Sequence, residues 1–190
     1  MSTTFVSPID KLWPTERPML RNVALVLFGT LLLYASAKVQ VPFWPVPMTM
    51  QTAVVVLIGM AYGWRLGAAT VVAYLAEGAV GLPVFVGTPE RGIGLAYMVG
   101  PTGGYLLGFV AAAAIAGWIV QGGHGLARMA LAVTGGILAI FVVGVAWLSV
   151  LIGFDNAIVH GVLPFLPSEI AKILFAIAVG VGMFRLRRQA

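Results

Sequence analysis

The sequence predicts an all-α integral membrane protein, and three observations support this prediction. Hydrophobic residues make up 61% of the 190 residues and charged residues only 9%, whereas soluble domains carry about 25% charged residues. Apolar runs about as long as a membrane-spanning helix, ~20 residues, recur along the chain. The basic residues fall mainly in alternate connections between these runs, as in multi-pass membrane proteins. The length predicts a single membrane domain over residues 1–190.

We expect six transmembrane helices, arranged as a bundle with both termini in the cytoplasm. Their approximate ranges are 20–38, 47–63, 65–82, 101–120, 128–152 and 167–185. Residues 1–18, the one extended polar stretch, are expected to form a cytoplasmic N-terminal arm. The first apolar run, followed by Ala35-Ser36-Ala37, also resembles a cleaved signal peptide. The long charged arm before that run favours a retained helix.

The positions of the basic residues support this topology. The cytoplasmic side would hold Lys11, Arg17, Arg21, Arg65, Arg128, Arg185, Arg187 and Arg188. Lys38 and Arg91 would lie outside, and Lys172 would lie within the last helix. An odd number of spans would break this asymmetry.

Two stretches between the apolar runs are expected to be non-helical. Residues 39–48 read VQVPFWPVPM, and residues 83–100 are rich in glycine and hold both Glu90 and Arg91. Irregular backbone in lipid would leave its hydrogen-bonding groups unsatisfied. We therefore expect both stretches to be extracellular loops that act as lids.

Glycines four residues apart form two series, Gly59, Gly63, Gly67 and Gly100, Gly104, Gly108. Small residues at this spacing let helix backbones approach closely. Close packing within the bundle is the expected result, and docking of a partner is the alternative.

Four polar residues lie inside the predicted helices: Gln51, Glu77, Glu169 and Lys172. A charged residue at mid-helix costs about 2.5–3.5 kcal/mol on insertion scales, so its presence indicates function. A rise of about 1.5 Å per residue from Arg65 and Arg185 places all four about 18–24 Å from the cytoplasmic ends. This common level predicts a pocket that opens outward beneath the two loops.

Each of these residues has a role in such a pocket and a structural alternative. Lys172 would bind an anionic ligand group, and the two glutamates would accept hydrogen bonds from ligand N–H groups. Gln51 would donate and accept, while Phe43, Trp44 and Phe85 would form apolar walls. Alternatively, Glu169 and Lys172 form only a structural pair, Glu77 is protonated or faces water, and Gln51 joins helices. Arg91 would reach the ligand or pair with Glu90.

Several classes of function are excluded or disfavoured by what the chain lacks. It has no cysteine, which excludes disulfides and thiolate sites. It contains no Walker A, H-E-x-x-H or G-x-S-x-G motif. The two histidines, His124 and His160, are far apart in the sequence, which argues against a metal site. We expect neither an enzyme nor a resident cofactor.

Four segments resemble the biotin transporter BioY family, the substrate-binding S components of energy-coupling factor (ECF) transporters. They are VPFWPVPMTMQT (41–52), YLAEGAVGLPVFVG (74–87), GPTGGYLLGF (100–109) and LPSEIAKILFA (166–176). The resemblance extends over about residues 20–185. It implies biotin uptake across a bacterial or archaeal inner membrane, and loops that close over biotin. It also implies that the acid-x-x-lysine pair, here Glu169 and Lys172, holds the ligand.

The complete set of candidate substrate-binding residues is Glu169, Lys172, Glu77, Gln51, Arg91, Phe43, Trp44, Phe85 and Tyr105. The expected partners are biotin, the lipid bilayer, and either an ECF coupling subunit with two ATPases or further copies of this chain. No nucleic acid is expected.

The chain also departs from the family pattern at three places. It has Ser168-Glu169 where relatives commonly have Gly-Asp, and its loop 87–94, GTPERGIG, carries two charges where relatives are often mostly glycine. It also lacks an Ala-x-x-x-Ala face in its first helix. Two other functions compete with biotin uptake: an S component for another vitamin, and a membrane scaffold or enzyme whose buried charges are structural.

Overall fold

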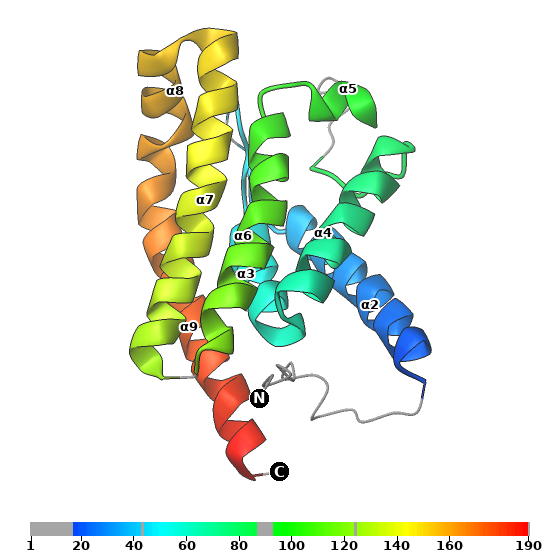
Figure 1. Cartoon of the computed structure of the whole chain (residues 1–190). Helices are drawn as coiled ribbons and strands as arrows, with labels where there is room; N and C mark the ends of the chain where they lie inside the picture. The colour runs from blue at the N-terminus through cyan, green and yellow to red at the C-terminus, as the bar shows by residue number, and fades with distance from the viewer. Residues whose placement is uncertain (1–16, 43, 87–92, 124, 190) are drawn as a thin grey trace.

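The computed structural model describes residues 17–42, 44–86, 93–123 and 125–189, which form a bundle of helices (Figure 1). The long helices are α2 (Pro18–Lys38), α3 (Gln51–Tyr62), α4 (Trp64–Ala79), α6 (Gly103–Gln121), α7 (Leu126–Ile152) and α9 (Leu166–Gln189). Helix α6 is central, because it packs against α3, α4 and α7. The short elements are α5 (Leu95–Met98), α8 (Phe154–Gly161) and the 3-10 helix η2 (Leu163–Phe165).

Four of the described segments are long and apolar enough to cross a bilayer. They are α2, α6, α7 and the stretch Phe154–Phe184, which contains α8, η2 and most of α9. Helix α3 is apolar but has only 12 residues, and α4 has 16. Several apolar helices of this kind make the chain a multi-pass membrane protein, while the expected count of six spans stays a prediction.

The expectation of a helix from residue 47 to 63 is wrong in its first residues. Met48–Thr49 form strand β2, which pairs antiparallel with β1 (Gln40–Val41) in the register Gln40↔Thr49 and Val41↔Met48. Prolines between the two strands restrict the backbone away from helix. Helix α3 therefore begins only at Gln51, within the bundle.

The glycine-rich stretch 83–100 is also less irregular than expected. Leu95–Met98 form the helical turn α5. Gly94 precedes it with a φ of 66°, a left-handed conformation that glycine adopts readily. The chain thus enters α5 from a sharp bend and returns toward α6.

Both glycine series take part in close helix packing. Gly67 brings its backbone against Gly59, and an ideal Cβ on Gly67 would lie 2.9 Å from the Cα of Gly59. Gly59 in turn lies against the backbone of Ala113 on α6. In the second series, a Cβ on Gly108 would lie 2.8 Å from the Cα of Ile140 on α7. These contacts hold α3, α4, α6 and α7 together without large side chains between them.

The connections between helices sort to the two ends of the bundle. Figure 1 shows the α3–α4 and α6–α7 connections at the lower end, where α9 also ends. The β1–β2 hairpin, α5 and the α7–α8 turn lie toward the upper end. The first turns of α3 and α9, which carry Gln51 and Glu169, lie between the two ends.

Candidate functional site

A cavity lies where the β1–β2 hairpin meets the first turns of α3 and α9 and the walls formed by α6 and α7. The empty space within it, counted together with open solvent, is ≈ 450 Å³. Its lining is Val46, Pro47, Thr49, Gln51, Thr52, Val86, Tyr97, Thr102, Tyr105, Phe109, Ile140, Phe141, Phe165, Glu169 and Lys172. Mostly apolar walls with a few polar groups are typical of a ligand site.

The charged part of the lining is one ion pair on α9. Lys172 Nζ lies 2.6 Å from Glu169 Oε1, and the two residues are only 7% and 4% exposed. Their spacing of three residues places both on one helix face. The carboxylate also lies in the first turn of α9, where the helix dipole stabilises negative charge. A buried pair of this kind needs further polar partners, because desolvation of both ions is costly.

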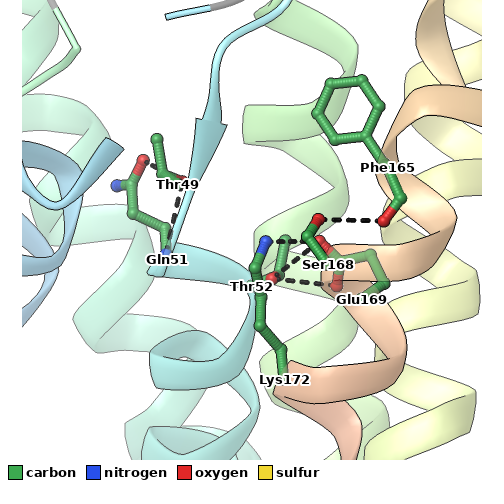
Figure 2. A network of polar contacts seen from close by, with 7 residues as sticks. All are labelled: Thr49, Gln51, Thr52, Phe165, Ser168, Glu169 and Lys172. Carbon is green, nitrogen blue, oxygen red and sulfur yellow. Dashed lines mark hydrogen bonds and ion pairs between the residues drawn. The ribbon is translucent and has the colours of Figure 1, made fainter. Parts of the chain in front are cut away.

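Thr52 on α3 supplies one such partner. Its Oγ1 lies 3.2 Å from Glu169 Oε1 and 3.1 Å from Oε2, so one hydroxyl proton is shared between both oxygens. Figure 2 shows Thr52, Glu169 and Lys172 as one cluster between the two helices. The contact joins α3 to α9 at the level of the cavity.

Gln51 lines the same cavity but directs its amide away from the ion pair (Figure 2). Its Nε2 donates to the hydroxyl of Tyr74 on α4 at 2.8 Å and to the carbonyl of Leu33 on α2 at 3.5 Å. Its Oε1 accepts from Thr49 Oγ1 at 3.4 Å. Gln51 therefore joins α2, α3 and α4, as the structural alternative expected, while it also lines the cavity.

Aromatic rings form much of the apolar wall. The Tyr105 and Phe141 rings meet edge to face at 6.1 Å, and Phe141 meets Phe165 in the same way at 6.1 Å. The Tyr105 hydroxyl donates to the carbonyl of Gly161 at 2.9 Å. Gly144 allows this ring to lie flat against α7, because a Cβ there would overlap the ring. The wall is thus fixed by packing on three elements.

The structure gathers some of the predicted site residues and separates others. Gln51, Tyr105, Glu169 and Lys172 line the cavity. Phe85 lies behind the lining, since it is 5% exposed and its ring stacks on that of Tyr97 at 5.2 Å. The remaining described candidates, Glu77 and Trp44, are not part of the lining.

Glu77 is half-buried on α4. Trp44 is 68% exposed, and its ring contacts that of His160 on α8 at 6.0 Å. Phe43 and Arg91 lie outside the described residues. Among the residues that the structure describes, no group of three or more metal-ligating side chains gathers.

Several lining residues were not found from the sequence. Thr52 directly follows Gln51 in the segment VPFWPVPMTMQT. Its position next to a polar residue at the start of a helix could have identified it as a candidate. Tyr97, Phe141 and Phe165 gave no such signal, because aromatic residues are common throughout membrane helices and their ends.

The comparisons with known proteins agree with this geometry. The family model of BioY matches residues 6–189. The chain is 36% identical over 159 residues to the "Probable biotin transporter BioY" of Pyrococcus horikoshii, covering 84% of this chain and 93% of that protein. It is 32% identical over 158 residues to the "Biotin transporter BioY" of Thermotoga maritima, covering 83% and 92%.

A solved structure has the same fold. It is described as the S-component for biotin from an ECF-type ABC transporter, with a TM-score of 0.75 and 23% sequence identity. The match covers 94% of this chain and 96% of that chain. Together, the family match over nearly the whole chain and the relatives at more than 30% identity show that the chain belongs to the BioY family, a family of transporters rather than enzymes.

Proposed function

We propose that the protein binds biotin in the cavity and mediates its uptake, with biotin as the transported substrate and no cofactor. The observation that carries the proposal is the buried Glu169–Lys172 pair on the cavity wall. It presents a hydrogen-bond acceptor and a donor side by side in an apolar site. The ureido ring of biotin has the complementary groups, N–H donors beside a carbonyl acceptor.

The short distance within the pair favours one orientation of the ligand. Because Lys172 Nζ lies 2.6 Å from Glu169 Oε1, both groups act at one place. The ureido ring and the carboxylate of biotin lie at opposite ends of the molecule and cannot both meet there. We therefore assign the ureido ring to the pair, with its N–H groups donating to Glu169 and its carbonyl accepting from Lys172. Lys172 binding the carboxylate, the role expected from the sequence, is the alternative.

Equilibrium binding to the detergent-purified protein tests the proposed function, with thiamin and riboflavin as controls. Tight binding that is selective for biotin supports it. Binding of thiamin or riboflavin instead would indicate an S component for another vitamin. A folded protein that binds none of them would leave the buried pair as a structural feature of a membrane scaffold.

Biotin methyl ester separates the two orientations. If the pair holds the ureido ring, Lys172→Ala weakens biotin and the ester by similar factors. If Lys172 holds the carboxylate, the substitution weakens biotin alone, because the ester carries no charge for the ammonium group to bind.

We further propose six spans in the inner membrane, with both termini cytoplasmic and the loops at 39–48 and 83–100 outside as lids. The distribution of connections in Figure 1 and the positions of the basic residues support this topology. The absence of cysteine makes the test simple. Ser2→Cys and Gly153→Cys should be labelled by an impermeant maleimide from opposite sides of the membrane, and labelling of both from one side would contradict the topology.

The energy source is proposed to lie in partner proteins. The chain has no Walker A motif, and its fold is that of an ECF S component. Biotin uptake in a biotin-requiring strain should therefore rise when an ECF coupling subunit and two ATPases are co-expressed. Equal biotin uptake in the strain without these partners would favour a solitary transporter. Uptake by the purified homo-oligomer in vesicles would support the same conclusion.

A further inference from the structure

Residues 83–86 form a short irregular segment whose carbonyl groups are satisfied from outside the segment. Lys38 Nζ at the end of α2 donates to the carbonyls of Pro83, at 3.1 Å, and Phe85, at 3.0 Å. The hydroxyl of Tyr74 on α4 donates to the carbonyl between them, that of Val84, at 2.9 Å. Three successive carbonyls thus accept from two side chains, which fixes the position of a segment that has no helix of its own.

This segment forms part of the cavity wall. Val86 lines the cavity directly. Phe85 is buried and stacks on Tyr97, with 19° between the rings, and Tyr97 is itself a lining residue. A displacement of residues 83–86 would therefore move two parts of the wall at once.

The chain that returns to α6 is held by contacts that do not involve Lys38. The indole Nε1 of Trp147 on α7 donates to the carbonyl of Gly100 at 3.0 Å in a partly buried position. Gly103 and Gly104 pack so closely against Met98 and Trp147 that neither has room for a Cβ. This end is locked by tight packing as well as by a hydrogen bond.

The hydrogen bond from Lys38 to Pro83 is more exposed to solvent than the bond from Trp147 to Gly100. The Lys38 side chain is exposed, and so is its hydrogen bond to Pro83. Water can replace such a bond with little net change in free energy. The ammonium group also lies 5.1 Å from the centre of the exposed Tyr34 ring. This cation–π contact lies within α2 and does not depend on residues 83–86.

Building on the proposed biotin binding, we propose that Lys38 is a positioning residue that latches residues 83–86 over the cavity and sets the rate of ligand release. When the two hydrogen bonds of Lys38 break, the segment is left with the bond from Tyr74 to Val84 and the packing of Phe85, so it moves more readily while the Trp147 end stays fixed. The ammonium group remains over the Tyr34 ring, close to the position from which it forms the two hydrogen bonds again. Lys38 itself does not line the cavity, so it acts on the ligand only through the segment.

The test is the biotin dissociation rate of Lys38→Met, which keeps an unbranched side chain and removes the donors. We expect dissociation at least about tenfold faster than in the wild type, with a smaller change in the association rate. Lys38→Arg should restore most of the wild-type rate, since the guanidinium group also donates to carbonyls. The matched control is Arg65→Met, at the start of α4 beside Trp64, which should leave dissociation unchanged.

Amide hydrogen exchange at residues 84–86 in the ligand-free protein gives a second, independent measurement. Faster exchange there in Lys38→Met, without faster exchange in the core of α6, is the expected result. Unchanged biotin dissociation in Lys38→Met would overturn the inference, even if thermal stability fell, since the role would then be structural. A wild-type protein that binds no biotin would overturn the proposed function instead, and the exchange data would still show whether Lys38 holds the segment.

Discussion

The hydroxyl of Thr52 lies between the two carboxylate oxygens of Glu169, at 3.2 Å and 3.1 Å. This contact joins the first turn of α3 to the first turn of α9. It also fixes the position of the Glu169 carboxylate. The hydroxyl therefore holds this side chain within the cavity wall.

Thr52→Val is expected to weaken biotin binding about fivefold, or about 1 kcal/mol, because the carboxylate loses one hydrogen bond while side-chain volume is nearly kept. Equilibrium binding measures the effect. Thr30→Val is the matched control, since the Thr30 hydroxyl donates to the carbonyl of Leu27 in its own helix. An equal loss in both variants would show that the effect is not specific to the cavity.

Lys172→Ala is expected to weaken biotin binding at least about tenfold, or about 1.4 kcal/mol, while the protein stays folded. The reason is the loss of the one cationic group among the residues that line the cavity. Unchanged affinity would exclude the role of Lys172 in binding.

A purely structural pair predicts a different result for the same variant. Lys172→Ala would then fold poorly, because an uncompensated carboxylate stays buried. The double variant Glu169→Gln and Lys172→Ala would restore folding by removing both charges. Comparing the thermal midpoints of the single and double variants separates the two readings.

Tyr74→Phe is expected to lower the free energy of unfolding by about 1–3 kcal/mol. The Tyr74 hydroxyl accepts from Gln51 and donates to Val84, and the side chain is 0% exposed. Its removal leaves both partners buried with fewer hydrogen bonds. Thermal unfolding in detergent measures the change, and Tyr34→Phe, at a ring 37% exposed, should have little effect.

Gly59→Ala is expected to destabilise the bundle by about 1–3 kcal/mol, because the new methyl group would overlap the backbone of Ala113. Gly182→Ala on α9 makes the same chemical change where no atom lies within 4 Å. The second variant should match or exceed the wild type in thermal stability, since alanine favours helix. Similar midpoints for both variants would contradict the packing described here.

The sequence predicted most helices within a few residues, for a clear physical reason. Apolar runs mark α2, α6, α7 and α9 directly, because lipid requires them. The start of α3 was predicted four residues too early, since it depends on the pairing of Met48 with Val41. That partner lies beyond the proline-rich turn, and local periodicity carries no signal for it.

Of the residues that line the cavity, the sequence predicted Glu169, Lys172, Gln51 and Tyr105. Glu169 and Lys172 stand out because charges inside an apolar run are expensive. Glu77 stood out for the same reason, yet α4 directs Tyr74, not Glu77, into the buried network with Gln51. Which face of a helix meets the cavity depends on the packing of the whole bundle, and one sequence does not determine it.

The shortness of α3 has a consequence for permeation. Its 12 residues span only about 18 Å, against a hydrocarbon thickness of about 30 Å. The remaining thickness on that side is occupied by the β1–β2 hairpin and the cavity. If the cavity opens outward as proposed, the packed helix layer beneath the Glu169–Lys172 pair is about 18 Å thick rather than about 30 Å. A ligand held there would therefore have a shorter barrier left to cross, along the lower halves of α3, α6 and α9.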